Sequence, residues 1–265
     1  MSPRGALRIA WYATRSGLSD YSAAFTWRSW LAGWYLRILA QVLFFATMGA
    51  LLGHSQTSYL LIGNAVFLMA THSLLATAST TWERDSGTLP LLVASPAPAW
   101  LVLLTRSLFW IPEGLACAVG ALLIIGPPLG VSLPLVRLLW CVPMLTLIGA
   151  TTYCLGVFLG SVVLARNDLR NVVGNAVSTT MMAICAVNVP AAALGPLVRR
   201  VADLLPLTHG LVAIRATLAH GPDAAVAAQL GYEAATGAGW LVAALLTLRV
   251  MERRSRRDGR IVFTA

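Results

Sequence analysis

The densest group of charges in this apolar chain is the run Glu83, Arg84 and Asp85. Charged side chains in such surroundings must be held by water, by lipid head groups or by another protein, because burying an unpaired charge is costly. Two acids and a base side by side can make oriented contacts with a charged partner. Gly87, two positions on, permits a tight turn. The run is therefore either a docking loop for a partner or a solvated loop that joins two helices.

A second candidate for chemistry is Glu113, which follows Pro112 in the middle of a long apolar stretch. A charged side chain at the centre of a bilayer costs roughly 2.5–3.5 kcal/mol on insertion scales. Glu113 must therefore be protonated, paired or close to water, and we expect His72, on the neighbouring antiparallel segment, to be its partner. Either Glu113 helps to gate or shape a path across the membrane, or it is a neutral carboxyl hydrogen-bonded to a neighbouring helix.

Several other chemistries lack the residues they need. All nineteen basic residues are arginine, so the chain has no lysine for a phosphate-binding P-loop, and ATP would have to be bound by another polypeptide. No GxGxxG dinucleotide motif is present. Cysteines and histidines lack the spacing of a metal site, and we predict none and no cofactor on this chain; they are Cys117, Cys141, Cys154 and Cys185, and His54, His72, His209 and His220.

Composition assigns the chain to the membrane class. Of its 265 residues 58% are hydrophobic and 11% are charged, with a mean hydropathy of +0.75, whereas about a quarter of a soluble domain is charged. A bilayer is crossed by about 20 apolar residues in a helix. We predict a single all-α membrane domain, 1–265, whose bundle at 37–249 has six spans: 37–53, 58–81, 101–126, 138–164, 172–190 and 225–249.

The arginines indicate the orientation of these spans. If both ends are cytoplasmic, fifteen of the nineteen arginines lie on the inner side, as the positive-inside rule requires. The loops at 82–100 and 165–171 are then cytoplasmic, and the basic tail at 250–265 touches anionic lipid. The net charge of +9 lies beside apolar spans rather than on a folded basic face, so we expect no nucleic-acid partner.

Two segments look irregular. Residues 1–36 are predicted to be cytoplasmic or interfacial, because six residues fall on one helical face of an amphipathic surface helix: Trp27, Trp30, Leu31, Trp34, Tyr35 and Ile38. The alternative is a longer, tilted first span. The outer segment 188–221 is interrupted by Pro190, Gly195, Pro196 and Pro206, which predicts two short helices that dip into the outer leaflet, or else a surface loop.

Polar residues within spans are candidates for a transport path. The segment 172–190 contains Asn175, Ser178 and Thr179, and we group them with Glu113 and His72. Two pairs of glycines four residues apart, at 49 and 53 and at 156 and 160, would let helices approach closely, which could include the contact between two copies of the chain.

The loop after the second predicted span resembles a known family. Glu83-Arg84-x-x-Gly87-Thr88-Leu89, then Leu91-Leu92 and Pro96, is similar to the cytoplasmic loop of ABC type-2 permeases, the membrane subunits of ATP-binding-cassette exporters. Leu205-Pro206-Leu207-Thr208 and Ala213-Ile214-Arg215 resemble the family's segment before its last span. Pro90 departs from the family, which usually has an acidic residue there, and this puts a polar contact at that position in doubt.

The resemblance implies a function. The loop would hold a short coupling helix that docks on an ATPase, with contacts from Glu83, Arg84, Asp85, Gly87, Thr88, Leu89, Leu91 and Leu92. Two ATPase copies would bind ATP and magnesium, a second permease half, identical or homologous, would complete the path, and the chain would catalyse no reaction. We expect a bacterial plasma membrane as its location.

Local signals add detail to that loop. Ser95 and Pro96 predict an N-cap and a first helical position for the third span, and Trp82 and Trp100 are expected at head-group level. The loop at 164–171 is a second candidate for ATPase contact.

Two alternatives remain on the sequence alone. A stand-alone secondary transporter would have repeated halves with matching broken helices, and the only obvious break lies late in the chain. An intramembrane enzyme would need more than Glu113, since no nucleophile motif or paired glutamates accompany it.

Overall fold

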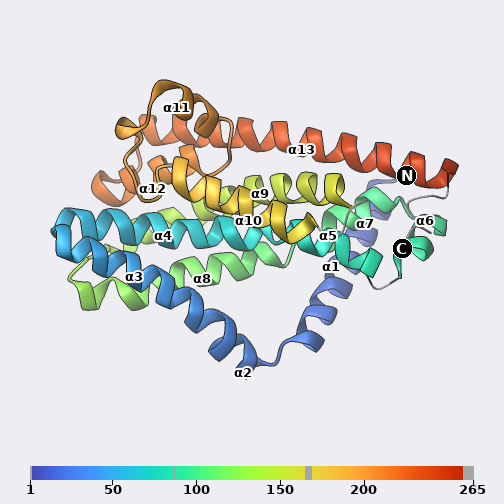
Figure 1. Cartoon of the computed structure of the whole chain (residues 1–265), viewed down its shortest axis with the longest axis horizontal. Coiled ribbons are helices and arrows are strands. Elements are labelled where there is room, and N and C mark those ends of the chain that lie inside the picture. The colour runs from blue at the N-terminus through green and yellow to red at the C-terminus, as the bar shows by residue number, and fades with distance from the viewer. Residues whose placement is uncertain (1, 86, 165–168, 259–265) are drawn as a thin grey trace.

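The computed structural model describes residues 2–85, 87–164 and 169–258, and every regular element in these ranges is helical. Figure 1 shows the helices running side by side along one long axis. In chain order the elements are α1 (Pro3–Ala24), α2 (Trp27–Ser29), η1 (Trp30–Tyr35), α3 (Leu36–Leu52), α4 (His54–Leu74), α5 (Ala76–Asp85), α6 (Leu89–Ala94), α7 (Ala99–Thr105), α8 (Trp110–Ile125), η2 (Pro127–Leu129), α9 (Leu135–Val163), α10 (Arg170–Ile184), η4 (Ala191–Ala193), α11 (Pro196–Asp203), α12 (Thr208–His220) and α13 (Ala224–Asp258).

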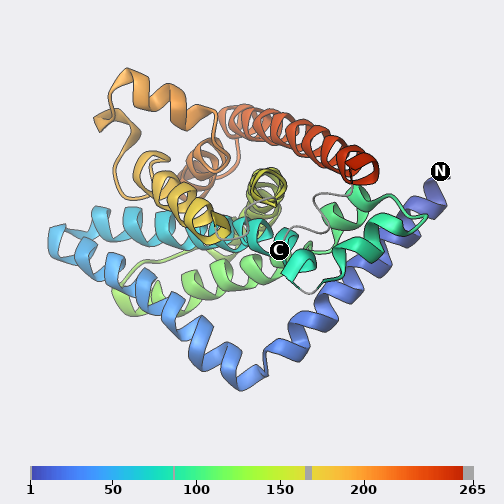
Figure 2. The ribbon, with the colours of Figure 1, turned by 45° about the vertical axis from the view of Figure 1, so that its right-hand side comes forward.

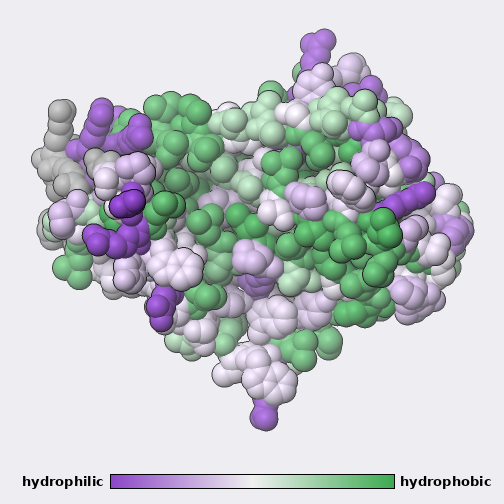
Figure 3. Space-filling model, turned by 180° about the vertical axis from the view of Figure 1, so that it is seen from behind, coloured by the Kyte–Doolittle hydropathy of each residue, from purple (hydrophilic) through white to green (hydrophobic). Residues whose placement is uncertain are grey.

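Five helical stretches in the described residues are long and apolar enough to cross a bilayer: Trp27–Leu52, His54–Trp82, Ala99–Leu129, Leu135–Val163 and Ala224–Arg254. A sixth is obtained if α11 and α12, which meet at a bend of 91°, count as one broken span. Figure 3 shows an apolar band between two more hydrophilic ends. These features confirm the prediction of an all-α membrane protein with a broken segment before its last span.

The predicted span at 172–190 is shorter in the structure. Helix α10 ends at Ile184 after 15 residues, a length of about 22 Å, whereas the hydrocarbon core of a bilayer is about 30 Å thick. Cys185, Ala186 and Val187 are buried but not helical, and Ala186 has a positive φ of 59°. The chain therefore leaves the helix inside the bundle.

Helix α4 is the centre of the bundle. It packs against α3, α8 and α9, and α9 packs in turn against α12 and α13 (Figure 2). From Leu60 to Ala70 every residue of α4 is buried. Because this stretch is covered on all sides, its apolar residues lie all round the helix and not on one face. The main core cluster lies around it and includes Leu61, Met69, Leu145 and Leu211.

The N-terminal segment differs from its prediction. The helix expected to lie flat, Trp27 to Ile38, instead continues through α2 and the π-helix η1 into α3 as one span, which is the alternative of a longer first span. The chain bends at Thr26, whose side chain forms a reciprocal capping box with Ser29. Helix α1 lies outside the five membrane-spanning stretches, and Figures 1 and 2 show α1 and α3 meeting in a V at α2.

Both glycine pairs are used within this chain rather than on its outside. A Cβ at Gly156 or Gly160 of α9 would meet α4 or α5; at Gly160 it would lie 2.8 Å from Thr80 Cβ. A Cβ at Gly49 would meet the backbone of Gln56 at 2.8 Å, and Gly53, with φ of 118°, forms the turn between α3 and α4. Gly49, Gly156 and Gly160 thus let neighbouring helices of one subunit approach closely, whereas Gly53 serves the turn.

We predict that Gly160→Val destabilises the protein by about 1–3 kcal/mol, because the added side chain forces α9 away from α5. Gly231→Val is the matched control: it lies on α13 with open space around its Cβ. Thermal unfolding of the detergent-solubilised protein measures both. Equal unfolding temperatures for the two variants would contradict the packing described here.

Candidate functional site

The loop with the charged run lies at one end of the bundle, near the start of α7 and the last turns of α13 (Figure 1). The backbone of Glu83, Arg84 and Asp85 forms the last turn of α5; their side chains, like residues 165–168 of the second candidate loop, lie outside the described residues. Gly87 turns the chain with φ of 68°, which favours glycine. Thr88 precedes α6, and Pro90 fits its first turn.

Helix α6 has one face in the core and one face open. Leu89 is buried in a second cluster together with Leu103 of α7, Leu164 and Leu248 of α13, and Leu92 packs against this cluster. Leu91, by contrast, is 73% exposed. The short helix is thus attached to three other parts of the bundle and still presents an apolar side chain outward.

The prediction for Ser95 is wrong. Its backbone N–H bonds to the carbonyls of Leu91 and Leu92, and its hydroxyl donates to Leu92 O, so Ser95 ends α6. The following helix, α7, begins at Ala99 after Pro98. Trp100, near the start of α7, donates its backbone N–H to the carboxyl of Glu252 at 3.4 Å, and its ring lies under the guanidinium of Arg249. These contacts fasten α7 to α13.

A polar cavity of about 290 Å³ lies between α3, α4 and α10. It brings together four of the five candidate path residues, His72, Asn175, Ser178 and Thr179. A smaller cavity of about 80 Å³ continues from it along α10 to Arg170. Most of α10 is exposed or half-buried, and only Met181 of this helix is fully buried. The side of the molecule with α3 and α10 therefore combines a polar hollow with a thinly covered helix.

Glu113 does not line this cavity. Its Oε1 accepts hydrogen bonds from Tyr21 of α1 and Trp30 of η1, both at 2.7 Å. The imidazole of His72 instead bonds to Leu68 O through Nδ1 at 2.8 Å and accepts from Trp34 Nε1 at 3.2 Å. The predicted hydrogen-bonded pair of Glu113 and His72 is therefore wrong, because tryptophans of the first span reach both side chains.

Glu113 instead fastens α1 to the bundle. Burial and the neighbouring carboxylate of Glu113 raise the pKa of Tyr21, so this hydroxyl stays a donor at all ordinary pH values. Thr14 of α1 donates to Thr105 O of α7 at 2.8 Å, and a Cβ at Gly17 would meet Arg106 O. Helix α1 therefore touches the end of α7 directly. The carboxyl has a structural partner on each side of the bend between α1 and α3.

Sequence reasoning missed a second carboxyl, Glu233 of α13, which is fully buried. Its Oε1 accepts from the backbone N–H of Leu207 at 3.0 Å and from the hydroxyl of Thr151 at 2.6 Å. Its Oε2 accepts from Gly210 N–H at 3.0 Å and lies 3.2 Å from Leu207 N. The first N–H groups of a helix have no partner within it, and a negative charge is favourable there. Glu233 therefore holds the start of α12 at the bend.

Arg215 plays the corresponding role at the end of α10, where it binds backbone carbonyls. Its guanidinium donates to Ala186 O at 2.7 Å and Val187 O at 3.0 Å, just beyond the last turn of that helix. It also bonds to Tyr59 O and stacks on the Tyr59 ring, with 3.5 Å to the ring centroid. A cation suits the unpaired carbonyls at a helix C-terminus. The family-like residues at 205–208 and 213–215 thus lie at the two places where helices break.

Among the described residues no group of three or more His, Cys, Asp or Glu side chains could hold a metal ion. The four cysteines are free, and three of them are buried in the apolar interior. Glu113, Glu233 and Arg215 thus form their hydrogen bonds with the backbone and with other side chains.

The fold defines a multi-pass membrane protein with a broken segment before its last span and a short helix attached to one end. Residues 18–219 match the family model described as ABC-2 type transporter. No match is found among individual proteins of curated function. Because the family model covers more than half of the sequence, the chain belongs to the ABC-2 type transporter family. It is the membrane permease component of an ABC transporter, a class that works with an ATPase subunit.

We predict that Glu233→Gln lowers the unfolding temperature, because an amide offers one acceptor oxygen, in place of two, to the two backbone N–H groups and the hydroxyl that bind the carboxyl. Each buried unpaired donor costs about 1–3 kcal/mol. Thr151→Val, which removes one hydroxyl donor but leaves the helix start paired, should cost less. Thermal unfolding in detergent ranks the variants.

Asp203→Asn is the control for Glu233→Gln: it removes an acid near the same bend, but its side chain is 47% exposed. We expect it to unfold like the wild type. If Glu233→Gln also did so, the carboxyl would not hold the start of α12.

A further prediction concerns the contact between α1 and Glu113. Tyr21→Phe keeps the ring beside Phe109, 5.1 Å between centroids, but loses the bond to Glu113, a loss of about 1.5 kcal/mol. Local opening of α1 should then speed tryptic cleavage at Arg15 roughly tenfold. Tyr12→Phe, on an exposed ring of the same helix, should leave the rate unchanged, and a similar rate for both variants would rule out the contact.

Proposed function

We propose that this permease is one half of an ATP-driven exporter, coupled to separate ATPase subunits through the α5–α6 loop. Two ATPase copies bind ATP and magnesium, and a second permease half, identical or homologous, completes the translocation path. Membership of residues 18–219 in the ABC-2 type transporter family is the observation that carries this proposal. This chain catalyses no reaction itself.

The docking surface in this proposal runs from the end of α5 to the end of α6. Glu83, Arg84 and Asp85 supply charge contacts, and Gly87 and Thr88 turn the chain. Leu91, 73% exposed, enters an apolar groove of the ATPase, while Leu89 and Leu92 keep α6 attached to the bundle. In this proposal Leu91 adds an apolar contact beside the charged run.

The packing offers a route from this surface to the other end of the molecule. Leu89 lies in one cluster with Leu248 and Met251 of α13, and the same continuous helix carries Glu233, which binds the start of α12. Movement of α6 by the ATPases would be transmitted along α13 to the bend between α11 and α12. A coupling path needs such a chain of packed elements.

The cargo path is proposed along the side of α3 and α10, where the second half would cover the polar cavity. His72, Asn175, Ser178 and Thr179 line that cavity, and Trp34 and Gln41 of the first span face it from the other side. Glu113 acts at a distance, by fixing the position of η1 and its tryptophans.

The topology in this proposal places α6, both termini and the start of α10 in the cytoplasm of a bacterial cell, in agreement with fifteen of nineteen arginines. The bend of α11 and α12 then lies at the outer surface. A stand-alone carrier would need matching broken helices in two halves, whereas the two breaks at which a non-glycine residue has a positive φ, Ala186 and Leu207, both lie in the C-terminal part of the described residues.

The test is co-purification of the ATPase from native membranes through a tag on the C-terminus, with mass spectrometry of the proteins recovered. Wild type should recover a P-loop ATPase in stoichiometric amount. Leu91→Gln should lose at least nine tenths of it, because a polar side chain is placed in an apolar groove.

Leu197→Gln is the matched control. Leu197 lies on α11 and is also 73% exposed, so the substitution changes an equally exposed leucine at the opposite end. It should recover as much ATPase as the wild type. A chain that purifies without any ATPase, even after cross-linking, would overturn the proposal.

A further inference from the structure

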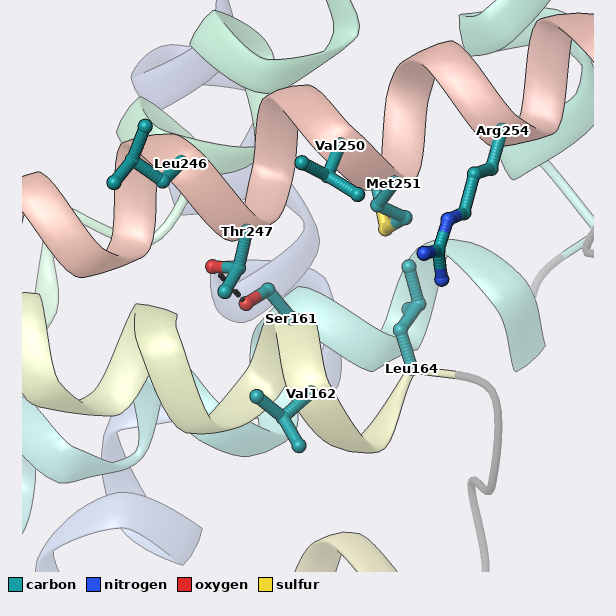
Figure 4. Close-up of a pocket in the computed structure, with 8 residues that line it drawn as sticks. All are labelled: Ser161, Val162, Leu164, Leu246, Thr247, Val250, Met251 and Arg254. Carbon is teal, nitrogen blue, oxygen red and sulfur yellow. Dashed lines mark hydrogen bonds between the residues drawn. The ribbon is translucent and has the colours of Figure 1, made fainter.

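Helices α9 and α13 pack along most of their length but separate near the end of α9, where a crevice of about 360 Å³ opens (Figure 4). Its rim consists of Val162, Leu246 and Val250, which are 57%, 58% and 46% exposed. Its floor includes the buried side chains of Leu164 and Met251. The volume is within the range of about 300–1,000 Å³ that is typical of small-molecule sites.

The floor of the crevice has two hydroxyl groups, and both are already paired. Ser161 Oγ lies 2.6 Å from Thr247 Oγ1 and 2.6 Å from Phe158 O, and Thr247 donates to Ala243 O at 2.9 Å. The dashed line in Figure 4 marks the contact between the two hydroxyls. An occupant on the floor therefore meets mainly methyl and methylene groups, because both hydroxyl protons are already donated within the protein. This surface suits a hydrocarbon chain.

Arg254 stands at the mouth of the crevice. Figure 4 shows its guanidinium reaching from α13 toward Leu164. It makes no ion pair or hydrogen bond with any residue in the described ranges, whereas Arg249, on another face of α13, stacks on Trp100. Arg254 is also the last residue of the membrane-spanning stretch Ala224–Arg254. Its charge is thus at the depth of the lipid head groups, and the apolar crevice lies just inside that depth.

We propose that this crevice binds an anionic phospholipid, with one acyl chain between α9 and α13 and the phosphate on Arg254. A guanidinium can bind two phosphate oxygens at once. The open rim faces outward, where lipid would lie, rather than toward the interior of the bundle. The positive charge of Arg254 at the mouth selects a negative head group. The site is separate from the polar cavity, although its floor residues Leu164 and Met251 belong to the cluster that also holds Leu89 of α6. Binding of a lipid here needs no ATPase, so the proposal does not depend on the proposed function.

Native mass spectrometry of the full chain, purified with its bound subunits in detergent, tests this site. The probe is an equimolar mixture of dioleoyl-phosphatidylglycerol and dioleoyl-phosphatidylcholine. Wild type should prefer the anionic lipid about fivefold, the effect of roughly one basic residue near a lipid phosphate. Arg254→Gln should bring the ratio close to one. Arg253→Gln, which removes the same charge from the neighbouring position, should keep the preference.

A second pair of variants tests the acyl chain. Val250→Phe fills the rim and should reduce the binding of both lipids, whereas Val242→Phe, on a 56% exposed residue of α13 that does not line the crevice, should bind as wild type. All four variants lie on the surface, and monodisperse elution checks their folding.

Four results would overturn the proposal. Equal losses for Arg253→Gln and Arg254→Gln would indicate general attraction to the basic tail. Displacement of the lipid by inorganic phosphate, or normal binding by Val250→Phe, would show that no acyl chain occupies the crevice. Cross-linking of Leu246→Cys to a co-purified subunit would show that a protein covers it.

Discussion

The non-helical backbone at 185–190 and at 204–207 imposes the strongest constraint on this fold, because part of it is buried among helices where water cannot satisfy it. Two buried or half-buried charges meet that constraint. Arg215 donates to the carbonyls of Ala186 and Val187, and Glu233 accepts from the N–H groups of Leu207 and Gly210. Leu207 has φ of 94°, an unfavourable conformation for leucine, and the bonds to Glu233 hold it there. Each charge also matches the dipole of the helix end that it binds.

These two contacts also connect the breaks to the rest of the bundle. Arg215 binds the backbone just beyond α10, and residues of α10 itself, Asn175, Ser178 and Thr179, line the polar hollow beside α3 and α4. Because Glu233 belongs to α13, the bend of α11 and α12 is tied to the helix whose other end packs around Leu89 of α6. The buried helix α4 thus forms the centre of the fold. Helix α13 connects the short helix α6 at one end of the molecule with the bend between α11 and α12 at the other.

The sequence predicted the class of the protein and most span positions, because composition and apolar segments are local signals, and the resemblance to the family implied the short helix. It did not predict Glu233, since a carboxyl inside an apolar segment gives no indication of a distant helix start. The partner of Glu113 was predicted incorrectly for a related reason: Tyr21 and Trp30 come from a segment expected to lie on the membrane surface. The residues around Arg215 resembled the family, but only the structure connects them with the end of α10.

Hydrogen exchange of the amides in the segment 204–211 tests the central claim most directly. In the detergent-solubilised wild type, the N–H groups of Leu207 and Gly210 should exchange as slowly as those in the middle of α4, since both are bound to a buried carboxylate. Glu233→Ala should bring them to the rate of an open turn while α4 remains protected. Fast exchange of these two amides in the wild type would contradict the account, because the bend would then be held by something other than Glu233.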